Sequence, residues 1–124
     1  MPELPDVEAF RRVLAEHTGD PITGVRVRDP GVLRDVGPRR LDRALRGHRF
    51  GTPRRHGKRL LAPAEGPVLT FHFGMTGSLS WHSHDDEPHP HDRVVLSLED
   101  GELRYRDMRK LQGIRLMENE AEAE

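Results

Sequence analysis

The chain has 124 residues, of which 33% are charged and 34% hydrophobic, so we expect one small domain with a thin apolar core. It holds no cysteine, which excludes disulfides and cysteine-ligated zinc within it, and no apolar run is long enough to span a membrane. The formal net charge is −1, yet the segment Arg39–Arg59 contains eight arginines and one lysine against a single acid, Asp42. Such a basic block suits either an anion-binding face or a solvated surface.

The first element that we predict is a helix from Pro5 to about His17. Its apolar residues recur at helical spacing and share one face: Val7, Phe10 and Leu14. Alternating side chains then predict a strand over residues 22–28. A second, short helix is expected from about Pro38 to Arg46, with Leu41 and Leu45 turned inward.

The rest of the chain indicates β structure. Alternation places apolar side chains on one face of two further strands: Leu69, Phe71 and Phe73 in the first, and Val94, Leu96 and Leu98 in the second. Asp100-Gly101 is a strong hairpin signal before a strand at 103–106, and the polar segment 83–90 reads as a mobile loop. The pattern predicts a mainly β fold with flanking helices. We expect an antiparallel β-sandwich of two sheets with an N-terminal helix and a second short helix.

The first three residues, Met1-Pro2-Glu3, suggest a nucleophile. Removal of methionine is usual before a small residue such as proline, and it would expose a secondary amine. An α-amino group is partly unprotonated at neutral pH, so it can attack a sugar C1′ and form an iminium, as lysine does in Schiff-base enzymes. The neighbouring Glu3 carboxylate could move protons during ring opening and elimination.

Four segments carry more specific information: residues 1–8, 54–61, 72–79 and 105–111. In this order and spacing they resemble the N-terminal domain of the formamidopyrimidine-DNA glycosylase and endonuclease VIII family, closer to the formamidopyrimidine-DNA glycosylase branch. The resemblance implies a bifunctional DNA glycosylase and AP lyase of base-excision repair. It implies removal of oxidised or ring-opened purines from damaged double-stranded DNA, with strand cleavage through a Schiff base on the N-terminal proline. We further expect a cytoplasmic, nucleoid-associated monomer that binds no membrane.

The same resemblance assigns roles to individual residues. It implies three catalytic residues: Pro2 as nucleophile, Glu3 as proton donor and acceptor, and Lys58, which we place in a cationic strand. It also implies five DNA-binding residues: Met75, Arg109, Leu111, His91 and Arg55. Met75 follows a strand in a tight turn, where a long apolar side chain suits insertion between bases when a nucleotide is flipped out.

This sequence departs from the family pattern in several places. Leu111 stands where many members have phenylalanine, and Gln112 stands where glycine is common. Leucine can still act as a wedge, but it stacks on a base less well than an aromatic ring. Asp6 replaces a glutamate with a shorter carboxylate, and Arg93 stands where histidine is common.

The family continues into a second domain with a helix–two-turn–helix element and usually a zinc finger, and no segment of this chain resembles either. We therefore expect residues 1–124 to be a single catalytic N-terminal domain without a cofactor, zinc being expected only in the missing region. Two alternatives stay open: a truncated, catalytically weak DNA-binding module, and a metal-binding protein that uses His82, His84, His89 and His91. His72 either lines a pocket or is an ordinary strand histidine.

Overall fold

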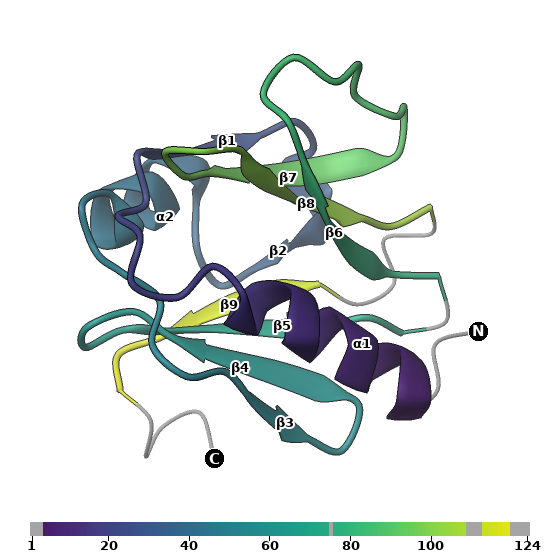
Figure 1. Cartoon of the computed structure of the whole chain (residues 1–124), viewed down its shortest axis with the longest axis horizontal. Coiled ribbons are helices and arrows are strands. Elements are labelled where there is room, and N and C mark those ends of the chain that lie inside the picture. Colours follow the sequence, from purple (N-terminus) through teal and green to yellow (C-terminus); the bar gives the residue numbers. More distant parts are fainter. Residues whose placement is uncertain (1–3, 75, 109–112, 120–124) are drawn as a thin grey trace.

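The computed structural model describes residues 4–74, 76–108 and 113–119 (Figure 1). Within this part, nine strands form two sheets that lie one above the other, with a helix in front and another at one end (Figure 1). The first sheet has the order β1-β7-β8-β6 and the second has the order β2-β9-β5-β4-β3. The predicted two-sheet sandwich with an N-terminal helix and a second short helix is confirmed.

The strand bounds follow this order. The first sheet contains β1 (Gly24–Val27), β6 (Ser78–His82), β7 (Asp92–Ser97) and β8 (Glu102–Arg106). The second contains β2 (Leu33–Arg34), β3 (Arg54–His56), β4 (Arg59–Pro63), β5 (Val68–His72) and β9 (Ile114–Met117). The facing surfaces of the two sheets bury a common core, which includes Leu60, Leu69, Phe71, Leu103 and Tyr105.

The helix α1 (Leu4–Ala15) closes one side of the sandwich, because it contacts β6 of the first sheet and both β3 and β4 of the second. Its apolar face carries Val7 and Leu14, which are fully buried, and Phe10, whose ring lies 4.6 Å from that of Phe73. The short helix α2 (Pro38–Leu45) buries Leu41 and Leu45, as predicted, and packs beside β1. None of the described helices is long and apolar enough to cross a membrane.

One strand pair departs from the antiparallel pattern. β2 runs parallel to β9, with Leu33 opposite Ile114, and follows directly after the 3-10 turn η1 (Pro30–Val32). Gly113 makes this close pairing sterically feasible, because a Cβ atom there would lie 1.8 Å from the carbonyl oxygen of Val32. The remaining strand pairs of both sheets are antiparallel.

The segment 83–91 is more firmly held than the sequence suggested. We predicted a mobile loop at 83–90, but the guanidinium of Arg104 on β8 donates hydrogen bonds to three of its carbonyl oxygens: those of Ser83, Asp86 and Glu87. Arg104 is only 2% exposed, because the loop covers the outer face of the first sheet at this point. The polar composition of the loop therefore reflects hydrogen bonding to a buried cation as well as to solvent.

Candidate nucleic-acid interface

The structure describes three of the eight predicted site residues. Arg55, Lys58 and His91 are described, whereas five fall outside the described residues: Pro2, Glu3, Met75, Arg109 and Leu111.

Lys58 lies in the turn that joins β3 to β4, where we had placed it within a cationic strand. The preceding Gly57 has φ +62°, a left-handed conformation that glycine adopts without steric cost. This turn places the Lys58 side chain in solvent, and no described residue forms an ion pair with its ammonium group. A lysine at the tip of a hairpin can reach a ligand that approaches the edge of the second sheet.

Arg55 ties this hairpin to α1. Its Nη1 donates to the carbonyl oxygen of Gly57 at 3.1 Å, and its Nε lies 3.9 Å from Oε1 of Glu8 on the helix. Hydrogen bonds from Arg11, against a smaller opposing effect of burial, lower the pKa of Glu8 to about 2, so this carboxylate is ionised at neutral pH. The helix that follows Pro2 and Glu3 in the chain is thereby joined to the hairpin that carries Lys58.

A cationic pocket opens on the outer face of the second sheet, with a volume of about 440 Å³. The antiparallel register places Arg59 on β4 directly opposite His72 on β5, and Thr70 opposite Arg115 on β9. Three arginines, one histidine and no acid are among the lining residues: Arg34, Arg59, Thr70, Phe71, His72, Gly113, Arg115 and Met117. The pocket is therefore suited to an anion.

His72 lines this pocket, which decides between the two interpretations of that residue. Burial, together with the positive charge of Arg59, lowers the pKa of His72 below its ordinary value. His72 is accordingly neutral at pH 7 and has one N–H donor to offer an anion. Another lining residue, Arg115, forms an ion pair with Asp35, in which Nη1 of Arg115 donates to Oδ2 of Asp35 at 2.7 Å.

Asp107 joins two segments that flank residues outside the described part. Its buried carboxylate accepts a hydrogen bond of 2.5 Å from the hydroxyl of Thr76, the residue that follows Met75 in the chain. The hydroxyl of Tyr105, whose pKa is raised by burial, lies 3.3 Å from the same carboxylate. Asp107 itself stands two residues before Arg109, so one side chain links both segments to the end of β8.

His91 lies beside Asp107. The backbone N–H of Asp107 donates to the carbonyl oxygen of His91 at 3.0 Å, and the rings of His91 and His89 lie 5.2 Å apart. The next residue, Asp92, is buried and accepts hydrogen bonds from Nε of Arg106 and from the backbone of His89. The end of the loop, the start of β7 and the end of β8 are thus held together.

The alternative of a histidine metal site is not supported. Among the residues that the structure describes, no group of three or more histidine, cysteine, aspartate or glutamate side chains could hold a metal ion. His82 contacts the hydroxyl of Ser80 at 2.7 Å, and His84 contacts the carboxylate of Glu102 at 3.1 Å.

Sequence reasoning missed Arg34, Arg115, Asp107 and Glu8. Arg34 and Arg115 meet because β2 pairs with β9 across 80 residues of chain, which local patterns do not reveal. Glu8 and Asp107 lie within segments that resemble the family, so the sequence did draw attention to their positions. The sequence did not indicate which residues they contact.

The fold and the site define a two-sheet β-sandwich domain with a cationic pocket on its outer face. The sequence model described as "Formamidopyrimidine-DNA glycosylase N-terminal domain" matches residues 1–114. The chain therefore belongs to the formamidopyrimidine-DNA glycosylase family.

Individual relatives agree with this assignment. The formamidopyrimidine-DNA glycosylase of Desulfitobacterium hafniense is 37% identical over 122 residues, which cover 97% of this chain and 45% of the relative. That of Methylococcus capsulatus is 44% identical over 112 residues, covering 89% of this chain and 41% of the relative. A solved structure of the Lactococcus lactis enzyme, non-covalently bound to DNA containing an AP site, has a TM-score of 0.87 at 29% identity. It covers 94% of this chain and 45% of that one. This chain thus spans about half the length of the relatives that it matches.

Proposed function

We propose that this chain is the catalytic N-terminal domain of a DNA glycosylase and AP lyase that acts in base-excision repair. Its substrates are oxidised or ring-opened purines in double-stranded DNA. Family membership supports the reaction class. Solved structures of the Lactococcus lactis relative are described as complexes with DNA that contains an AP site or FAPY-dG, which supports the substrate class.

The observation that carries the proposal is the cationic pocket beside the Lys58 hairpin. Arg59 lines the pocket and directly follows Lys58 in the chain. A backbone phosphate held by Arg59, Arg115 and the N–H group of His72 would bring the DNA strand alongside the hairpin tip. Lys58 would then lie near a neighbouring phosphate, where its charge stabilises the anion that leaves during elimination.

The proposed reaction begins at Pro2. Its amine forms a bond to C1′ while the glycosidic bond breaks, and the base leaves with that electron pair and takes up a proton. Opening of the sugar ring gives an iminium. Loss of a C2′ proton expels the 3′ phosphate, and a second elimination expels the 5′ phosphate. Glu3 donates and accepts the protons, and water finally releases the sugar fragment from Pro2.

Borohydride trapping tests this chemistry. We expect the chain, incubated with an abasic duplex and borohydride at neutral pH, to form a covalent complex in which the DNA is joined to Pro2. The variant Pro2→Glu should retain Met1 and form none. Absence of trapping by the wild-type chain, under conditions where it binds the duplex, would instead support the DNA-binding module without catalysis.

A salt titration tests the pocket. Each phosphate contact contributes about 0.9 to the slope of log affinity against log salt, so Arg59→Ala should reduce that slope by about 1. Arg26→Ala on β1, which removes a side chain that is 62% exposed and belongs to the other sheet, serves as the matched control and should leave the slope unchanged. Equal slopes for Arg59→Ala and the wild type would show that the pocket does not hold phosphate.

A further inference from the structure

His84 faces hydrogen-bond acceptors with both of its ring nitrogens. Nδ1 lies 3.1 Å from Oε1 of Glu102, and Nε2 lies 2.9 Å from the carbonyl oxygen of Leu98 and 3.4 Å from that of Glu99. Carboxylate and carbonyl oxygens accept hydrogen bonds but cannot donate them, and a neutral imidazole has a single N–H. Both contacts can be hydrogen bonds only when His84 is an imidazolium.

The carboxylate of Glu102 favours that state. Glu102 is buried, with its side chain only 4% exposed, and its other oxygen faces Nε of Arg104 at 3.1 Å and Nη2 of Arg26 at 3.9 Å. The segment that carries His84 contains two further titratable side chains, His82 and Asp86. Nδ1 of His82 lies 3.6 Å from Oδ2 of Asp86. The hydrogen bond to Glu102 raises the pKa of His84, with some opposition from burial and further support from the two carbonyl oxygens.

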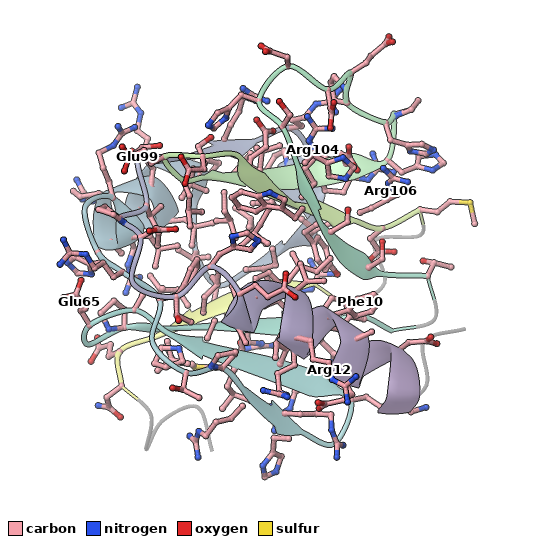
Figure 2. The ribbon with its side chains drawn as sticks, in the orientation of Figure 1. Phe10, Arg12, Glu65, Glu99, Arg104 and Arg106 are labelled. Carbon is pink, nitrogen blue, oxygen red and sulfur yellow. The ribbon has the colours of Figure 1, made fainter. Side chains whose placement is uncertain are left out.

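Glu102 connects His84 to the rest of the loop through Arg104, which lies on the face of β8 below that loop (Figure 2). The other nitrogens of Arg104 hold three loop carbonyl oxygens: those of Ser83, Asp86 and Glu87. Its Nη1 is also 4.0 Å from Asp92, whose carboxylate accepts a hydrogen bond from the backbone of His89. His91 directly precedes Asp92 in the chain, and its backbone nitrogen lies 3.0 Å from Nδ1 of His89.

We propose that His84 is a positioning residue: as an imidazolium it fastens the loop 83–91 to β8, and thereby holds His91 in place. Deprotonation removes one of the two N–H donors, so the loop loses a fastening as the pH rises through the His84 titration. The loop is then held by Arg104 and Asp92 without the histidine. The consequence for DNA binding by His91 rests on the proposed function, but the state of the loop does not.

Nuclear magnetic resonance of the full chain measures the first part directly. At neutral pH, the ring nitrogens of His84 should show the chemical shifts of an imidazolium, while those of His82 serve as an internal comparison. Hydrogen-exchange protection of the backbone amides at 85–91 should fall roughly two- to fivefold as His84 titrates, which is the range expected for loss of one partly exposed ion pair. A neutral His84 at pH 7, or protection that does not follow its titration, would refute the proposal.

Two substitutions separate charge from shape. His84→Arg keeps a cation with several donors at every pH, so it should retain loop protection at pH 8.5, a pH chosen to lie about two units above the ordinary histidine value. His84→Gln is neutral throughout and should show the weaker protection at both pH 6 and pH 8.5, values chosen as roughly either side of that titration. His82→Gln removes a neighbouring histidine and should behave as the wild type. If His84→Gln retains the protection of the wild type at low pH, the charge of His84 has no positioning role.

The affinity of the chain for a damaged duplex tests whether His84 influences DNA binding through His91. The wild type should lose affinity with rising pH roughly two- to fivefold more than His84→Arg does, again the range for one ion pair. If no variant binds DNA, the proposed function fails while the nuclear magnetic resonance result still decides the role of His84. If DNA is bound with the same pH dependence in both proteins, the link from His84 to His91 is wrong.

Discussion

Replacing Thr76 by valine tests whether Asp107 fastens the segment at Thr76 to the end of β8. The two side chains have nearly the same shape, so the substitution removes the hydroxyl without opening a cavity. That hydroxyl donates to a carboxylate oxygen of Asp107 at 2.5 Å, and Asp107 is only 2% exposed. A hydrogen bond to a buried charged group contributes about 1.5–3 kcal/mol, so the free energy of unfolding should fall by about 2 kcal/mol.

Thermal and urea unfolding both measure this loss. At roughly 3–5 °C per kcal/mol for a domain of this size, Thr76→Val should lower Tm by about 8 °C. The matched control is Thr23→Val, whose exposed hydroxyl donates to the carbonyl oxygen of Ser97 at 3.1 Å. Its effect should stay within about 0.5 kcal/mol, as for most surface substitutions. Equal losses in the two variants would refute the idea that Asp107 holds this segment through Thr76.

Three other predictions follow from buried contacts. Gly113→Ala would place a methyl group 1.8 Å from the carbonyl oxygen of Val32, so urea unfolding should show a loss of at least about 3 kcal/mol. Arg104→Met leaves buried carboxylates beside it without their cation, and the same measurement should show a loss of about 3–5 kcal/mol. Burial alone would raise the pKa of Asp92, but hydrogen bonds and the charge of Arg106 hold it below its ordinary value of 3.8. Its contribution to stability is therefore complete above that value and is lost as the pH falls through the lower, folded pKa. The free energy of unfolding should therefore fall less steeply with decreasing pH in Asp92→Asn than in the wild type. An equal fall in both proteins would contradict this role of Asp92.

The elements that the sequence predicted correctly are those whose signal is local. Helix α1 and strands β5 and β7 each carry an apolar face with the period of their own secondary structure. β6 was not predicted as a separate strand, because only Leu79 and Trp81 alternate with serine and histidine over its five residues. The two-residue β2 has no periodicity of its own and exists only through its pairing with β9.

The candidate site also combines residues that have a local sequence signal with features that depend on long-range pairing. Lys58 and Arg55 were found through a short segment that resembles a known family, and His91 through its alignment with a histidine of that family. Such a resemblance says which residues matter but not which atoms they contact. Arg55 shows the difference, because we predicted a DNA contact and the structure shows its guanidinium on Gly57 and near Glu8. The cationic pocket depends on side chains from four strands, so it becomes visible only when the sheet is assembled.

The position of β9 within its sheet has a consequence for synthesis. The second sheet has the order β2-β9-β5-β4-β3, so a strand near the end of the described chain lies between strands made much earlier. While the ribosome adds residues, β5 exposes one unpaired edge and β2 has no partner, because both await β9. Pairing between segments so distant in sequence is slow to form. The nascent chain therefore completes this sheet, and the pocket on its outer face, only after residue 117 has emerged.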